Sequence, residues 1–191
     1  KGYLYIAQPP LFRAKRGQSE VYLKDQRELD GYLVDAGLKD SVLITSDGQQ
    51  LAGPDLTAVT GQAVTASRMI EVVGRQVGNR DVVEQAAIAG LFNMAVLKND
   101  EAATYLAKRL EAIASILEKG WEGGIEDTAH GNAIVVKRRL RGINERYAID
   151  RRIINLVEAR HLDQMAGHLQ SHYSKPAQLR FGEQAMGISG P

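Results

Sequence analysis

The sequence of 191 residues predicts an α+β fold, with helices in the middle of the chain and strands toward both ends of it. Residues 54–77 carry apolar side chains at alternating spacings of three and four, the period of a helix with one buried face. Residues 125–149 change to a period of two, which is typical of strands. Apolar residues make up 44% of the chain and charged residues 25%, as in ordinary globular domains that bury a core.

The N-terminal part reads as strands followed by a short helix. Pro9 and Pro10 end an apolar run without alternation, which is typical of a strand covered on both faces. Gly17 marks a hairpin turn, Gly37 is the expected helix stop, and Asp47–Gly48 is a turn pair. The expected elements are a strand over residues 3–7, a hairpin of residues 11–15 and 20–23, a helix over 26–34 and a strand over 42–45.

The rest of the chain reads as a helical middle, a β-hairpin region and a C-terminal helix. Pro54 suits a first helical turn, whereas Gly61 and Gly74 cost that helix about 1 kcal/mol each, so it needs packing partners. Asp150 either caps a short helix over 151–154 or leads straight into the last helix. The expected elements are helices over 54–77, 79–91, 101–119 and 156–173, strands over 125–128, 133–140 and 143–149, and a tail over 175–191 rich in Gly, Ser and Pro.

Several classes of function are excluded by residues that the sequence lacks. The chain has no cysteine, which excludes disulfides, thiolate zinc sites and cysteine nucleophiles and fits a cytoplasmic protein. It contains no nucleophile elbow, no phosphate-binding glycine motif and no Asp-x-Asp pair after a strand. No apolar run is long enough to span a membrane, so no membrane partner is expected. We therefore expect no catalytic, metal-binding or cofactor-binding residue in this chain.

Three histidines fall on one side of the expected last helix. His161 and His172 are about 16 Å apart along that helix and cannot share one metal ion. His168 and His172 have the spacing of a zinc pair, but the sequence offers no third ligand. The simpler interpretation is that all three lie beside the apolar stripe.

Basic residues concentrate between residues 135 and 160, a stretch that contains eight Lys or Arg residues and only three Asp or Glu residues. On a strand, Lys137, Arg139 and Arg141 share one face, because side chains alternate. Arg138 falls among the buried residues of the opposite face, so we expect it to snorkel or to pair with an acid. A second basic group lies at the first hairpin. The candidate DNA-contacting residues are Lys137, Arg139, Arg141, Arg146, Arg151, Arg152, Arg13, Lys15 and Arg16.

The alternative for these residues is a solvated surface whose charges pair with Asp and Glu from elsewhere in the fold. The net charge of the chain is +1, so overall charge does not favour nucleic acid. The basic stretch lacks the interleaving of aromatic and basic residues that would favour single-stranded binding.

One stretch is specific enough to indicate a family. Gly2-Tyr3-Leu4-Tyr5-Ile6-Ala7-Gln8-Pro9-Pro10-Leu11-Phe12, then Gly17, then Tyr22-Leu23-Lys24-Asp25, resembles the B subunit of bacterial DNA gyrase. In that family this segment ends the core of the Toprim domain. The resemblance implies that residues 1–25 are the C-terminal piece of Toprim. It also implies that residues 26–191 are the insertion domain found in many Gram-negative B subunits, cut at Pro191.

This resemblance implies the function of a larger parent protein, a type II topoisomerase that supercoils DNA negatively with ATP. Duplex DNA and the A subunit of DNA gyrase, in an A2B2 tetramer, are the implied partners, and ATP and magnesium the implied cofactors of the full-length protein. The acidic Toprim motifs and the Gln-Arg-Tyr-Lys-Gly-Leu-Gly-Glu signature are absent, so we expect an architectural fragment that contacts DNA or braces Toprim against the A subunit. The alternatives are the B subunit of topoisomerase IV and a free-standing, non-enzymatic interaction module.

Overall fold

The computed structural model describes residues 9–45 and 48–191 and confirms an α+β fold. The strand expected over residues 3–7 lies outside the described residues. The elements in chain order are β1 (Phe12–Arg16), β2 (Ser19–Leu23), α1 (Gln26–Leu38), β3 (Ser41–Ile44), β4 (Gln50–Leu51), α2 (Gly53–Val77), α3 (Arg80–Ile88), η1 (Met94–Lys98), α4 (Asp100–Ile113), η2 (Ile116–Glu118), β5 (Glu122–Thr128), β6 (Gly131–Leu140), β7 (Ile143–Ile149), α5 (Arg151–Ile154), α6 (Val157–Gln164), α7 (Ala166–Tyr173), β8 (Ala177–Phe181) and β9 (Gln184–Ile188).

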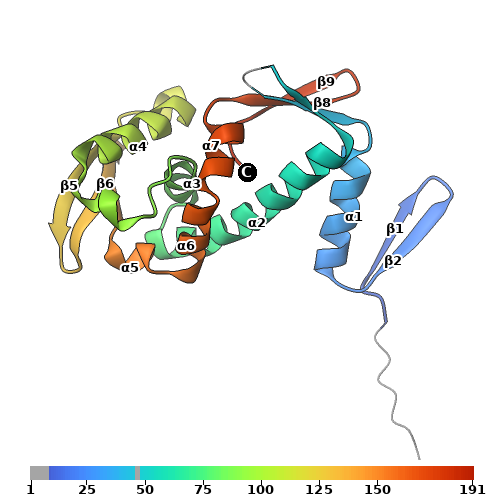
Figure 1. Cartoon of the computed structure of the whole chain (residues 1–191), viewed down its shortest axis with the longest axis horizontal. Helices are drawn as coiled ribbons and strands as arrows, with labels where there is room; N and C mark the ends of the chain where they lie inside the picture. Colours follow the sequence, from blue (N-terminus) through green and yellow to red (C-terminus); the bar gives the residue numbers. More distant parts are fainter. Residues whose placement is uncertain (1–8, 46–47) are drawn as a thin grey trace, which may run out of the picture.

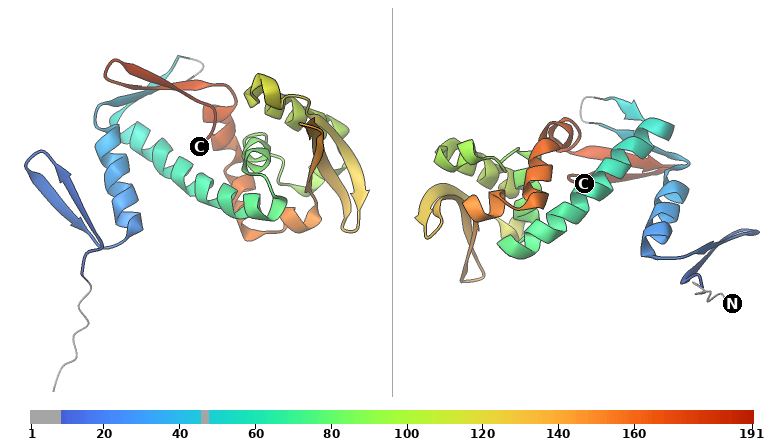
Figure 2. Two further views of the ribbon diagram at one scale, coloured as in Figure 1. Left: turned by 180° about the vertical axis from the view of Figure 1, so that it is seen from behind. Right: turned by 60° about the horizontal axis from the view of Figure 1, so that its bottom comes forward.

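Within the described part, the strands form three antiparallel sheets, of strand order β1-β2, β4-β3-β8-β9 and β5-β6-β7. The β1–β2 hairpin and the β5-β6-β7 sheet lie at opposite ends of the molecule, and α2 runs along the space between them (Figure 1). The same separation is seen from behind and from below (Figure 2). Any surface that combines the two basic groups of the sequence would therefore have to span the whole length of the protein.

Helix α2 organises the core as its sequence period predicts. Its seam contributes Ala66, Ile70 and Val73 to the main core, which α3, α4, α6 and α7 complete. Its N-terminal turns contribute Leu56 and Val59 to a second, smaller core beneath the β4-β3-β8-β9 sheet. Gly78 ends the helix with a φ of 93°, a left-handed conformation that glycine adopts without strain. The two interior glycines are thus tolerated because the helix is packed along its length.

Several helix boundaries differ from those expected, and α3 ends at Ile88 rather than at residue 91. Helix α1 continues through Gly37, which does not stop it, because Leu38 packs against the smaller core. Helix α4 ends at Ile113 and not at residue 119, and a separate turn, η2, follows it. The expected final helix is divided at Met165, which is both the C-cap of α6 and the N-cap of α7. Asp150 does cap a separate α5, since its Oδ1 accepts from the backbone N–H of Ile153 at 3.0 Å.

The C-terminal tail, expected only to be rich in Gly, Ser and Pro, forms the β8–β9 hairpin. Strand β8 pairs with β3, with Leu179 opposite Leu43, so the C-terminal hairpin completes a sheet begun near the N-terminus. Ala177 and Leu179 point into the smaller core, whereas Phe181 is 48% exposed. The region expected as a hairpin is likewise a three-stranded sheet, because β5 also pairs with β6.

The β5-β6-β7 sheet packs directly against α4 at a glycine, where the absence of a side chain allows close approach. An added Cβ at Gly123 of β5 would overlap the carbonyl oxygen of Ala103 in α4. The turn between β6 and β7 consists of Arg141 and Gly142, with φ values of 50° and 83°, the pattern of a two-residue turn that matches strand twist. Arg141 therefore lies in the turn and not on the strand face where the sequence alternation placed it.

Candidate nucleic-acid interface

The exposed face of the β5-β6-β7 sheet brings together part of the predicted basic group. Lys137 stands between Glu122 of β5 and Arg146 of β7, and Arg139 stands opposite Asn144. Both side chains are exposed, as is Arg141 at the adjoining turn. The strand alternation thus places Lys137 and Arg139 as expected, while Arg141 joins them through the turn.

One member of this group is neutralised by an acid. The Arg146 guanidinium is 2.8 Å from the Glu126 carboxylate, across the full width of the sheet. By the strand register this ion pair passes over Val135, which explains why Val135 is 2% exposed although it shares a face with Lys137. Arg146 therefore pairs with an acidic residue of the fold, as the alternative to DNA contact predicts.

The remaining candidates divide between two places. Arg151 and Arg152 are exposed on α5, directly after β7. Arg13 and Lys15 lie on β1 at the other end of the molecule, and both reach Glu20, at 3.4 and 3.8 Å. Arg16 lies on the same strand. Within residues 9–45 and 48–191, no carboxylate is within 4.0 Å of the charged groups of Lys137, Arg139, Arg141, Arg151 or Arg152.

Arg138 points to the opposite face of the sheet and is paired there, as its place in the alternation predicts. Its Nε donates to Glu145 at 2.7 Å, and a terminal nitrogen donates to the Glu118 carbonyl at 2.8 Å. The guanidinium also lies over the Trp121 ring, 4.4 Å from its centroid. Arg138 is therefore part of the fold and unavailable to a nucleic acid.

The histidines do not form a metal site in the described part of the chain. The rings of His168 and His172 are 4.3 Å apart, and His172 Nδ1 lies 3.0 Å from the His168 carbonyl. Burial and the neighbouring His172 lower the pKa of His168. Among the described residues, no three His, Asp or Glu side chains converge on one point, so these residues form no ready-made ligand cluster for the magnesium ion that the family implies.

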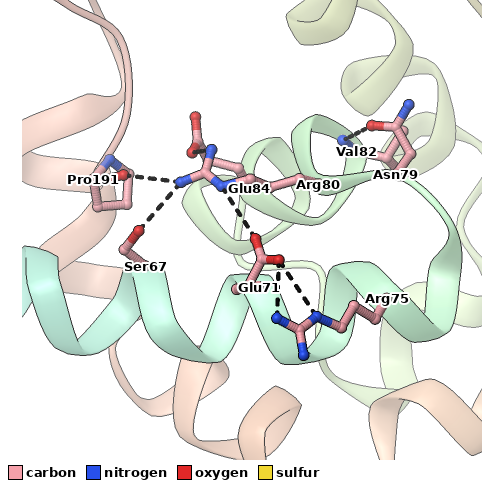
Figure 3. Close-up of polar contacts among 8 residues, drawn as sticks. All are labelled: Ser67, Glu71, Arg75, Asn79, Arg80, Val82, Glu84 and Pro191. Carbon is pink, nitrogen blue, oxygen red and sulfur yellow. Dashed lines mark hydrogen bonds and ion pairs between the residues drawn. The ribbon is translucent and has the colours of Figure 1, made fainter. Parts of the chain in front are cut away.

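A half-buried ion pair that the sequence analysis missed fixes the end of the chain (Figure 3). Arg80 contacts Glu84 at 2.5 Å and also donates to Ser67 at 3.2 Å and to the Pro191 carbonyl at 3.4 Å. An added Cβ at Gly190 would overlap the Glu84 carboxylate, so the last residues pass directly over it. The spacing of four between Arg80 and Glu84 was visible in the sequence, but the burial of Glu84 was not.

Burial raises the pKa of Glu84, and it outweighs the opposing effects of the Arg80 charge and hydrogen bond. The reason is an unequal loss of water: the Glu84 side chain is 10% exposed, whereas that of Arg80 is 40% exposed and remains screened. Burial, with a smaller effect from Glu84, also raises the pKa of Tyr173. The end of the chain therefore covers a carboxylate whose ionisation opposes folding.

Replacement of Glu84 tests this arrangement. The folded protein holds the Glu84 proton more tightly than the unfolded chain, whose pKa is near 4.5, so its contribution to stability is full below pH 4.5 and falls as pH rises through the folded-state pKa. In urea unfolding, we expect the stability of the wild type relative to Glu84→Gln to decrease as pH rises from 4.5 through the folded-state pKa of Glu84, and then to stay level. The control is Glu183→Gln, which makes the same substitution at an exposed position in the β8–β9 turn. A constant difference for Glu84→Gln would contradict the prediction.

No helix in the described ranges is both long and apolar enough to cross a lipid bilayer.

Comparison with known proteins extends the resemblance from the N-terminal motif to the whole chain. The DNA gyrase B subunit of Caulobacter vibrioides is 33% identical over 191 residues, which cover 100% of this chain and 22% of that protein. The DNA gyrase B subunit of Rickettsia prowazekii is 31% identical over the same length, 23% of that protein. The chain thus spans less than a quarter of the length of these curated relatives.

A further relative, which matches over a shorter part of the chain, is named as a type 2 topoisomerase and not as a gyrase. The type 2 topoisomerase B subunit of Aquifex aeolicus is 36% identical over 56 residues, which cover 29% of this chain and 7% of that protein. No protein-family model matches the chain. The expected resemblance to the B subunit of DNA gyrase is confirmed, and it holds from the first residue to the last.

Proposed function

We propose that this chain is a segment of the B subunit of a DNA gyrase, a type II topoisomerase. The observation that carries the proposal is the similarity to gyrase B subunits along the whole of this chain, which no short shared motif would produce. Because the chain matches less than a quarter of those proteins, ATP-driven negative supercoiling is proposed for the whole protein, acting with the A subunit on duplex DNA in the cytoplasm. ATP and magnesium would be bound by other parts of the full-length protein.

The part that this segment plays is architectural in our proposal. Two observations support a role without chemistry: the sequence lacks a phosphate-binding glycine motif, and the described residues contain no cluster of carboxylates suited to a metal. Its rigid features are instead the packed helices and the two larger sheets. We propose residues 1–25 as the end of the Toprim core and residues 26–191 as the insertion.

We propose further that the segment contacts the DNA backbone through Lys137, Arg139 and Arg141. These three side chains are exposed and adjacent, and no carboxylate of the described chain neutralises them at close range. Arg151 and Arg152 extend the same charge onto α5. Cations of this kind recognise phosphates without regard to sequence.

A salt titration tests the DNA contact. Three phosphate contacts predict a slope of log K against log salt near −3, at about 0.9 per phosphate on duplex DNA. The triple change Lys137→Glu, Arg139→Glu and Arg141→Glu should abolish binding of a labelled duplex in fluorescence anisotropy. The fold should persist, because these three side chains are exposed, whereas Ile134 and Val136 on the opposite face of β6 are buried and Leu140 is partly buried. A melting curve of the same variant checks this.

The matched control changes the same amount of charge elsewhere. Lys39→Glu, Lys175→Glu and Arg180→Glu change exposed positions outside the β5-β6-β7 sheet, and this triple variant should keep most of the affinity. Equal loss in both variants would mean that only net charge matters. A triple change at the sheet that lowers the melting temperature and leaves DNA affinity unaltered would instead favour bracing of neighbouring domains.

A further inference from the structure

A cavity of about 300 Å³ opens between α3, α4 and the C-terminal end of α7, away from the basic sheet. Its walls include Gln85 from α3, Tyr105, Lys108, Arg109 and Ile113 from α4, and Tyr173 from α7. Cavities of this size accommodate one large side chain or a small ligand. None of the predicted DNA-contacting residues lines it, so the basic sheet does not account for it.

The charge of this cavity is one-sided. Its lining contains two cations, Lys108 and Arg109, and no Asp or Glu. Within the described ranges, no carboxylate lies within 4.0 Å of either cation. Arg109 is held in place by the Tyr173 and Ser174 carbonyls, each at 3.2 Å, where it caps the end of α7. Arg109, held by two carbonyls, and the exposed Lys108 therefore face a mainly apolar space without a counter-charge.

A buried amide in the same wall has one hydrogen bond too few. Arg109 Nε donates to Gln85 Oε1 at 3.0 Å, and a guanidinium has no acceptor, so the amide oxygen must face it. Gln85 Nε2 is then a donor, and it has no partner in the described chain although the residue is fully buried. A buried donor without a partner destabilises the folded state. Gln85 Nε2 would donate a hydrogen bond to a carbonyl or carboxylate oxygen of a bound ligand.

The apolar surface continues outside the cavity. Tyr105 and Ile113 at its rim are 44% and 41% exposed, and the next residues along the chain, Ile116 and Leu117, are 88% and 81% exposed. Helical periodicity predicted Leu117 to share the buried face of α4, but the helix ends at Ile113 and η2 turns both side chains into solvent. Adjacent exposed apolar residues of this size are typical of protein contact sites.

We propose that this cavity and the η2 surface bind an acidic protein segment, which inserts one aromatic or branched side chain into the cavity and places carboxylates at Lys108 and Arg109. The apolar lining selects the inserted side chain, and the unopposed cations select its acidic neighbours. The exposed Ile116 and Leu117 extend the contact beyond a small-molecule site, which favours a polypeptide as the occupant. This inference is independent of the proposed DNA contact.

Three capped pentapeptides separate the two requirements. Asp-Asp-Phe-Asp-Asp carries both features, Lys-Lys-Phe-Lys-Lys reverses the charge, and Asp-Asp-Ala-Asp-Asp removes the inserted side chain. In titrations of the isotope-labelled full chain by amide NMR, we expect the first peptide to shift resonances of residues 105–117 and to bind at least about tenfold more tightly than the other two.

Variants locate the binding. Lys108→Glu, at an exposed position, should weaken binding of the first peptide about fivefold, which is the upper end of the range for one exposed ion pair. Ile113→Asp should weaken both phenylalanine peptides. Lys98→Glu, an exposed lysine on η1, is the matched control and should bind as the wild type does. The proposal is overturned by equal binding of the three peptides, by shifts confined to other regions, or by no binding up to about 10 mM.

Discussion

Replacing Gly123 by alanine should destabilise this protein more than any other single methyl group added to its sheets. The new Cβ would overlap the Ala103 carbonyl oxygen, a backbone atom in the first turn of α4 that cannot rotate away, and would also press on the Ala107 side chain at 3.1 Å. Relief requires that α4 and the β5-β6-β7 sheet move apart. We expect a loss of about 3 kcal/mol, the upper range for overpacking, and a melting temperature lower by about 6–12 °C.

The neighbouring residue provides the control. An added Cβ at Gly124 meets nothing within 4 Å, because that position faces the other side of the sheet. Gly124→Ala should therefore leave the midpoint of urea unfolding unchanged or slightly raised, since alanine restricts the unfolded chain more than glycine does. Equal destabilisation by both changes would show that the strand requires glycine for flexibility, and would contradict the close contact with α4.

Features that depend on neighbours in sequence were predictable. The seam of α2, the Asp150 cap and the two faces of β7 follow from spacing, because each is decided within a few residues. The β8–β9 hairpin was missed because its partner, β3, lies near the other end of the chain. Tertiary packing also decided where α4 ends, against a periodicity that continued to Leu117.

The same distinction applies to the candidate sites. The exposure of Lys137 and Arg139 follows from strand alternation, whereas the Arg146–Glu126 ion pair depends on the order of three strands. The cavity beside Arg109 is made by α3, α4 and α7, and no local pattern marks residues so far apart. The separation of Arg13 and Lys15 from the basic sheet is likewise a property of the fold alone (Figure 1).

Removal of the Arg138 charge should have the second-largest effect. Arg138→Met keeps the aliphatic stem that packs in the sheet, but it leaves the Glu145 carboxylate, 25% exposed, without its partner at 2.7 Å. It also removes the contact with the Trp121 ring and the donor to the Glu118 carbonyl. We expect a loss of about 2–3 kcal/mol, below the range for a fully buried pair because Glu145 retains some water. Urea unfolding followed by Trp121 fluorescence measures it.

Two further variants show whether the loss comes from an unpaired charge. Arg139→Met removes the same charge one position along β6, on the exposed face, and should change stability by less than about 0.5 kcal/mol. Adding Glu145→Leu to Arg138→Met removes the stranded carboxylate, so the double variant should regain much of the stability, because an apolar pair often replaces a buried ion pair without loss. If the double variant is as unstable as the sum of the two single variants, the Trp121 and Glu118 contacts of Arg138 matter more than its charge pairing.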